Sequence, residues 1–175
     1  MHTNFDLLLS EEPTTDCAAI PAPLRALATE LTEGGNSSRT GLALLGPAAY
    51  EQGRQWASPC LRLRPVHLGR EVLAWCEAQG TGRVLLDGMG LLGHVLRVHY
   101  ADPPRTVGTW LWGLDVLLAK LTPDQRTTFW AELWHWRQRP PLLVVLPAEL
   151  AAAFGPDDVD TRWGAARPPR GVRVV

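Results

Sequence analysis

Residues 83–93, RVLLDGMGLLG, decide the fold that the sequence predicts. Within them, residues 84–87 form an apolar run of strand length that ends on the carboxylate of Asp87, and Gly88 follows at once. In an open α/β sheet, ligands bind in the loops that follow the carboxyl ends of the strands. The segment therefore predicts a short buried strand with Asp87 at a functional edge. The alternative interpretation is that the Asp87 side chain only caps the turn that follows it.

The rest of the chain alternates between helical and extended patterns. Residues 105–120 carry the clearest apolar stripe of a helix, and residues 94–104 are interpreted as a connection. The run LLVVL at residues 142–146 lacks alternation, which is typical of a strand buried on both faces. Strands are expected at residues 41–45, 60–65, 84–87, 142–146 and 171–175, and helices at residues 21–33, 48–57, 67–79, 105–120, 122–137 and 148–154. This alternation predicts a three-layer α/β fold with a mostly parallel sheet of about five strands and helices on both faces.

Length and composition restrict the function classes. The 175 residues are expected to form an N-terminal segment with one helix, residues 1–40, and one α/β domain, residues 41–175. The net charge of -1 gives no bulk attraction for nucleic acid or for an anionic membrane. Three cysteines, Cys17, Cys60 and Cys76, lack paired short spacing, which argues against a disulfide framework and against a cysteine zinc site. No segment has the length of a membrane span, so a reducing cytoplasm is the expected setting.

Residues 46–54, GPAAYEQGR, occupy the place where a phosphate-binding loop would follow the first strand. A working loop of this type has two glycines five apart, then Lys and Ser or Thr. Here Gly46 and Gly53 are seven apart, Arg54 stands in place of Lys, and Glu51 adds negative charge. These residues, together with Asp87, are the weak candidates for nucleotide binding.

From residue 41 to residue 175 the chain resembles the core of RecA/AAA-type P-loop NTPases, on its order of elements and on the strand ends at residues 46–47 and at Asp87. The resemblance implies a RecA-like fold with a degenerate phosphate loop. Two kinds of relative match that description. One is the SulA- or ImuA-like group of bacterial proteins, which act by binding partners; the other is the small accessory subunits of phage-defence systems such as BREX.

Tryptophan is concentrated in one part of the chain, with five of the eight residues between Trp110 and Trp136. On the expected helices, Trp112 lies off the core stripe, and Trp130 and Trp134 widen the apolar face beyond what one sheet needs. Exposed aromatic side chains anchor protein–protein interfaces, so these three residues are the candidates for partner binding. The alternative is a deep core between the helices and the sheet.

The C-terminal segment is rich in arginine and contains one tryptophan. Cationic and aromatic side chains together are the features of single-stranded nucleic-acid binding sites. The weak candidates for such contacts are Arg162, Trp163, Arg167 and Arg170.

Taken together, the sequence predicts a non-enzymatic interaction subunit of a bacterial cytoplasmic complex, acting in DNA maintenance or phage defence. It predicts a protein partner, no catalytic residue, no cofactor and no metal, and a second copy of the chain remains an open alternative as partner. One alternative function is an atypical ATPase subunit that binds ATP and Mg through Asp87. The other is nucleic-acid binding through the C-terminal arginines.

Overall fold

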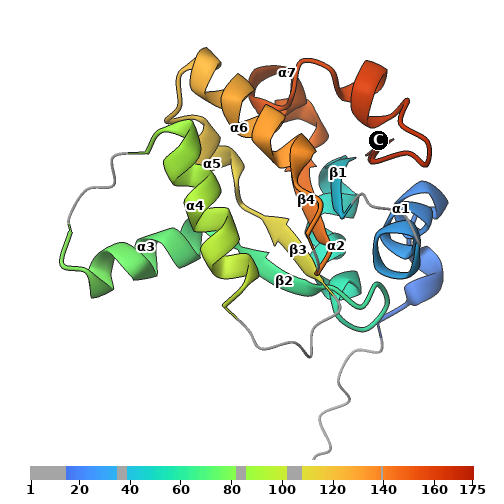
Figure 1. Ribbon diagram of the computed structural model, residues 1–175. Coiled ribbons are helices and arrows are strands. Elements are labelled where there is room, and N and C mark those ends of the chain that lie inside the picture. Colours follow the sequence, from blue (N-terminus) through green and yellow to red (C-terminus); the bar gives the residue numbers. More distant parts are fainter. Residues whose placement is uncertain (1–14, 35–38, 82–85, 102–107, 139) are drawn as a thin grey trace, which may run out of the picture.

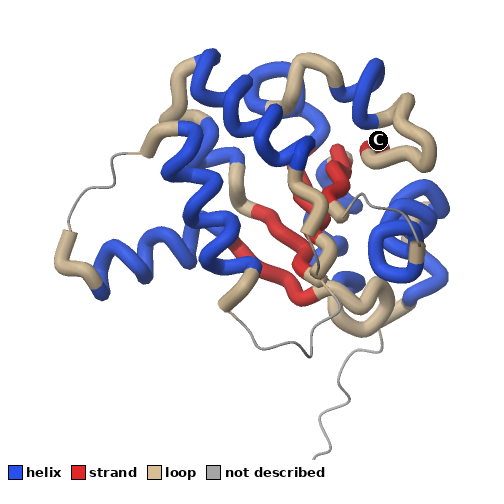
Figure 2. The backbone as a smooth tube through the Cα atoms, in the orientation of Figure 1, coloured by secondary structure: helices blue, strands red, loops and turns tan. Residues whose placement is uncertain are grey.

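A five-stranded sheet runs through the centre of the molecule, with helices on either side (Figures 1 and 2). The computed structural model describes residues 15–34, 39–81, 86–101, 108–138 and 140–175. The strands are β1 (Thr40–Leu45), β2 (Arg64–His67), β3 (Thr109–Trp112), β4 (Leu142–Pro147) and β5 (Gly171–Val174). Their order is β2-β3-β4-β1-β5, and all four neighbouring pairs run parallel. The predicted α/β class is confirmed, and the sheet is parallel throughout its described strands.

Helices cover both faces of the sheet because the chain changes once the direction in which it moves across the sheet from strand to strand. From β1 it crosses to the far edge at β2, and every later connection moves back toward β5. Since parallel crossovers are right-handed, the first crossover lies on one face and the later ones on the other. The helices are α1 (Ala22–Glu33), α2 (Pro47–Ala57), α3 (Leu68–Ala78), α4 (Gly88–His99), α5 (Asp115–Leu118), α6 (Pro123–His135) and α7 (Ala151–Phe154), with the short turns η1 (Cys17–Ala19), η2 (Ala148–Leu150) and η3 (Val159–Trp163).

The two central strands, β1 and β4, are fully buried and supply both halves of the core. In β1, Leu42 and Leu44 face the side of α4 and α6, whereas Ala43 and Leu45 face the side of α1 and α2. This is the two-residue alternation of a strand, and it is invisible in the sequence because both faces need apolar side chains. Figure 1 shows α4 and α6 side by side over one face and α2 behind the other.

One predicted helix is wrong. Residues 105–120 contain strand β3 and the short helix α5, while residues 105–107 lie outside the described residues. The chain turns at Gly113, whose φ of 66° suits glycine and ends the strand. The run TWLW of β3 is rich in residues that favour strands. This apolar run, followed by the apolar residues of a helical turn, imitates the apolar stripe of a single helix.

The strand expected at residues 84–87 is not found in its described part. Leu86 and Asp87 lie outside any strand, and Val84 and Leu85 lie outside the described residues. Asp87 is instead the N-cap of α4, and its Oδ1 accepts a hydrogen bond of 2.6 Å from the N–H of Gly90. The capping interpretation is therefore confirmed. Helix α4 also replaces the first part of the connection expected at residues 94–104.

Other boundaries agree with the sequence or shift slightly. Thr122 and Gln125 form the capping box that starts α6, as the run TPDQ predicts. Strand β2 begins at Arg64 rather than at Cys60, because residues 58–61 form a turn after α2.

None of the described helices combines the length and the apolar character that crossing a membrane requires.

Cysteine usage contradicts the sequence prediction. Cys17 and Cys60 form a disulfide, with their Cα atoms 5.5 Å apart, and only Cys76 is a free thiol. The bond ties turn η1 to the segment that follows α2. Spacing could not reveal it because the two residues are 43 positions apart and meet only when α1 packs beside α2 on the sheet.

His99, at the end of α4, is a buried polar contact between the helix and the sheet. Its Nδ1 lies 2.9 Å from the hydroxyl oxygen of Thr109, and its Nε2 lies 3.0 Å from the carbonyl oxygen of Pro140. A neutral ring satisfies both groups if Nε2–H donates to the carbonyl and Nδ1 accepts from the hydroxyl. Burial lowers the pKa of His99; the bond to Pro140 opposes that shift, and the charge of Arg64 adds to it.

We expect the free energy of unfolding to decrease as the pH falls below about 6.5, the usual pKa of histidine. The pKa of His99 is lower in the folded than in the unfolded chain, so protons favour the unfolded state in the window between the two values. The loss is at most about 1.4 kcal/mol per pH unit for one histidine. Urea unfolding between pH 5 and 8 measures it. The dependence of the free energy of unfolding on pH should weaken in His99→Gln and persist in His135→Gln, whose side chain is exposed. An unchanged dependence in His99→Gln would contradict the assignment.

Candidate functional site

The carboxyl edge of the sheet is the first place to look for a site. The chain leaves β1 toward α2 on one face, and it leaves the neighbouring β4 toward α7 on the other face. Such a reversal opens a crevice between adjacent strands, and ligands of parallel α/β proteins bind there. The crevice of this fold therefore lies between the ends of β1 and β4.

Residues 46–54 do not form a phosphate loop at this crevice. Gly46 is the N-cap of α2, and its N–H donates to the carbonyl of Val174 at 2.6 Å. The next residue, Pro47, already belongs to the helix, so no loop separates strand from helix. Gly53 and Arg54 lie about two turns farther along α2, roughly 10 Å from Gly46 at 1.5 Å per residue.

The four candidate residues for nucleotide binding are therefore not all brought together. Asp87 caps α4, an element that packs against α3 and α6, and it follows none of the five strands. Gly53 is buried against Trp110. Arg54 lies with its guanidinium carbon 5.9 Å from the ring centroid of Trp112. Only Gly46 lies at the end of β1.

Gly53 is needed for packing, which gives a direct test. A Cβ at residue 53 would lie 2.5 Å from Cζ2 of the buried Trp110, whereas one at Gly93 on α4 would meet nothing within 4 Å. We expect Gly53→Ala to lose about 1 to 3 kcal/mol of stability through overpacking, although alanine favours a helix. Gly93→Ala should gain about 0.5 to 1 kcal/mol. Thermal unfolding of both variants measures the difference, and a stabilised Gly53→Ala would refute the packing role.

Side chains of the protein itself occupy the carboxyl edge. The hydroxyl of Tyr50, in the first turn of α2, accepts a hydrogen bond of 3.3 Å from the N–H of Gly113 at the end of β3. Tyr50 thus spans from the end of β1 to the end of β3, past β4, which lies between them. Trp112 packs beside it with ring centroids 6.2 Å apart, and His67 lies 4.4 Å from Trp112. Aromatic side chains therefore line the carboxyl edge between the ends of β1 and β3.

The surroundings of Tyr50 disfavour ionisation of its hydroxyl. Burial raises the pKa of Tyr50, which the bond from Gly113 opposes, and three carboxylates add to the increase: Asp115, Glu51 and Glu149. The hydroxyl therefore stays protonated while it accepts the bond from Gly113. The sequence prediction assigned no role to Tyr50. The only related signal in the sequence was the negative charge of the next residue, Glu51, which argued against a bound phosphate.

The three tryptophans proposed for partner binding lie in different environments. Trp130 is 3% exposed, and its Nε1 donates to the carbonyl of Phe154 at 2.8 Å. Trp112 lies in β3 and not on a helix. Trp134 is half-buried on α6. They do not form one exposed aromatic patch, and for Trp130 the deep-core alternative is correct.

The C-terminal arginines are also divided. Arg167 is exposed, and Arg162 forms an ion pair of 3.2 Å with Asp158. Trp163 and Arg170 are 1% and 3% exposed, so neither is placed to contact a nucleic acid. The four residues share a segment but not a surface.

Arg170 is a structural cation in the core. Its Nε donates to the carbonyl of Thr40 at 3.0 Å, and its Nη1 donates to the carbonyl of Trp134 at 2.9 Å. Its guanidinium carbon lies 4.0 Å from the ring centroid of Trp134. Burial lowers the pKa of Arg170 to about 10, and the charges of Arg137 and Arg162 add to that shift. At neutral pH the side chain is charged and holds the end of α6 to the start of β1.

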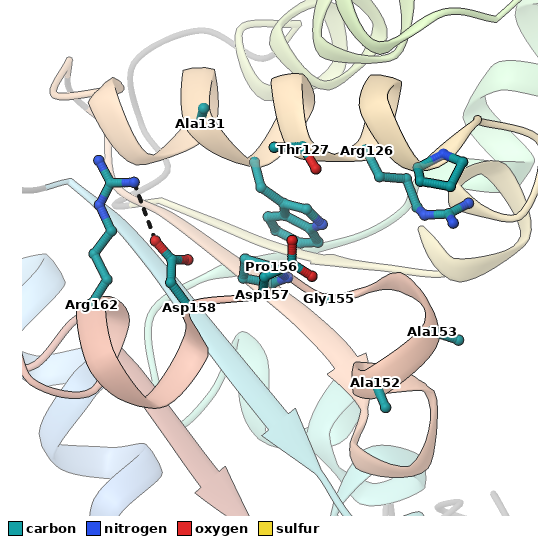
Figure 3. A pocket seen from close by; sticks show the side chains of 12 residues that line it. Arg126, Thr127, Ala131, Ala152, Ala153, Gly155, Pro156, Asp157, Asp158 and Arg162 are labelled. Atoms are coloured by element: carbon teal, nitrogen blue, oxygen red, sulfur yellow. Dashed lines mark hydrogen bonds and ion pairs between the residues drawn. The ribbon is translucent and has the colours of Figure 1, made fainter.

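A cavity of about 310 Å³ lies between α6 and the segment from α7 to η3 (Figure 3). We call it the α6 groove. One wall is the face of α6 that carries Thr127 and Ala131, and the other contains Pro156 and Asp157. The full lining is Pro123, Arg126, Thr127, Trp130, Ala131, Ala152, Ala153, Gly155, Pro156, Asp157, Asp158 and Arg162.

Charged side chains lie along the α6 groove. Figure 3 shows the pair of Arg162 and Asp158 at one end and Arg126 at the other. Nη1 of Arg126 donates to the carbonyls of Leu118 and Leu121, at 3.3 and 2.6 Å. Residues 123, 126, 127, 130 and 131 share one face of the helix that the sequence predicts at residues 122–137. The opposite wall has no such signal in the sequence.

The described residues contain no group of three or more His, Cys, Asp or Glu arranged to hold a metal ion. The α6 groove, a cavity lined by charged side chains of both signs, is the candidate functional site. Comparison with known proteins gives no further identification, since no family model, no curated protein and no solved structure matches this chain.

Proposed function

We propose that the chain is a non-enzymatic interaction subunit of a bacterial cytoplasmic complex, built on a RecA/AAA-like α/β core. The observation that carries the proposal is the occupied carboxyl edge. Tyr50 bonds to Gly113 across the crevice where a nucleotide of a parallel α/β protein would bind. A fold of this class in which α2 begins directly after β1, without a phosphate loop, is suited to binding a partner rather than to hydrolysis.

The α6 groove supplies the surface that such a subunit needs. It lies on α6, one of the elements on which the sequence places its candidate tryptophans, and it is separate from the occupied edge. A role in DNA maintenance or phage defence rests on the RecA/AAA resemblance alone, because a fold does not specify a pathway.

Two measurements on the intact protein test the proposal. Titration calorimetry with Mg·ATP and Mg·ADP should give no binding heat at millimolar nucleotide. A pulldown from the native cell should recover one stoichiometric protein partner. Micromolar nucleotide binding would favour the ATPase alternative instead, and binding to single-stranded DNA that weakens steeply with salt would favour the nucleic-acid alternative.

The Cys17–Cys60 disulfide opposes the proposed cytoplasmic location, and the redox state of this cysteine pair in the cell decides between them. A reducing compartment keeps most protein thiols reduced, and disulfides persist in oxidising ones. Trapping thiols with iodoacetamide in intact cells, followed by mass spectrometry, should find Cys17 and Cys60 alkylated if the protein is cytoplasmic. Recovery of the bonded pair would place it in an oxidising compartment.

A further inference from the structure

We infer that the α6 groove binds an extended peptide segment of about four residues from the partner protein, and that this segment carries an acidic, an apolar and a basic side chain. The inference rests on the proposed function, since it names the chemistry of the partner that the subunit would bind. Three features of the groove carry it: its length, its apolar floor, and the signs of its charges.

The length of the groove fits a short extended segment. On the α6 side the lining runs from Pro123 to Ala131, which spans eight residue steps and about 12 Å of helix. An extended chain advances about 3.3 Å per residue, so about four residues cover this distance. A volume of about 310 Å³ matches a few side chains rather than a whole helix.

The floor of the groove can accept an apolar side chain. Trp130 and Pro156 lie among its lining residues and are themselves buried, whereas the small residues beside them keep the groove open. Ala131 lies on one side, and Ala152 and Gly155 lie on the other. Because these residues have short side chains or none, they leave room that the partner can fill, and burial of an apolar group contributes about 25 cal/mol per Å².

Two charges of opposite sign are available to a ligand. No carboxylate of the described residues pairs with Arg126, whose contacts are two backbone carbonyls and the ring of Phe154. Asp157 forms no ion pair with the described residues, in contrast to Asp158, which is bound to Arg162. An acidic side chain beside Arg126 and a basic one beside Asp157 would complement both charges.

A displayed library of random twelve-residue peptides, selected on the intact oxidised protein, tests the inference. We expect enriched peptides to carry an acidic, an apolar and a basic residue within a short window. Their affinity should fall at least tenfold in Thr127→Arg, which fills the groove. Thr128→Arg is the matched control, because Thr128 is the exposed neighbour on the same helix and does not line the groove. Asp157→Lys should reduce binding of the same peptides at least threefold.

The outcomes separate this inference from the proposed function. Selection that yields no peptide sensitive to Thr127→Arg overturns the groove as a peptide site, and so does equal loss in Thr127→Arg and Thr128→Arg. The native pulldown is then repeated with Thr127→Arg. If the partner is still recovered, the interaction function stands and the groove is not its site; if no partner is recovered even by the unmodified protein, the proposed function itself fails.

Discussion

Replacement of Arg170 by alanine is expected to destabilise the protein by about 2 to 4 kcal/mol, a large fraction of the stability of an ordinary domain. The side chain is 3% exposed and donates to the carbonyls of Thr40 and Trp134. Its loss leaves two buried acceptors without these donors, a cavity, and an indole without its stacked cation. Urea unfolding followed by tryptophan fluorescence measures the change.

Two further variants separate this structural role from nucleic-acid binding. Arg170→Lys keeps the charge but not the planar group that donates in two directions while stacking on Trp134, so we expect an intermediate loss. Arg167→Ala, at an exposed position of the same segment, should change stability by less than about 0.5 kcal/mol. A stable Arg170→Ala that had lost only affinity for single-stranded DNA would restore the original interpretation of the segment.

Reduction of the Cys17–Cys60 disulfide is expected to lower the free energy of unfolding by about 4 kcal/mol. The bond closes a loop across 43 residues, and a cross-link of that span restricts the unfolded chain by this amount in the loop-entropy model. The folded contacts of the two cysteines are otherwise modest, since both are half-buried at the margin of the core. Urea unfolding with and without a phosphine reductant gives the difference.

The double variant Cys17→Ser, Cys60→Ser provides the control for reduction. It should unfold at the midpoint of the reduced protein and show no further response to the phosphine. Thiol counting under denaturing, non-reducing conditions should find one thiol, Cys76, in the oxidised protein. Three thiols in protein purified without reductant would contradict the bond.

The sequence is sufficient for the class of fold and for most of its helices. Strands β1 and β4 and the start of α6 follow from local signals, namely an uninterrupted apolar run and a capping box. It was misleading at residues 105–120, where an apolar pattern fits both a helix and a buried strand followed by a helical turn. Gly108 and Gly113 were the available signal for a strand, since the apolar run between them has only four residues.

The candidate site was less accessible to sequence reasoning than the fold. Asp87 follows an apolar run, but whether an acid ends a strand or caps a helix depends on the sheet around it. The contact of Tyr50 with Gly113 joins residues 63 positions apart, and the α6 groove needs two segments whose meeting is set by packing. Local patterns carry no information on such long-range contacts. The burial of Arg170 could not be read from an arginine-rich tail for the same reason.

The cross-link between Cys17 and Cys60 also determines how the molecule would respond to force. When the chain is pulled from its two ends, tension passes through the sulfur atoms and bypasses the stretch between them, which contains α1, β1 and α2. That stretch stays shielded until the bond is reduced. The oxidised chain therefore has a contour length shorter by about 150 Å, at about 3.6 Å for each bypassed residue. Under load, strand β1 sits inside a covalent ring and is among the last parts of the protein to become extensible.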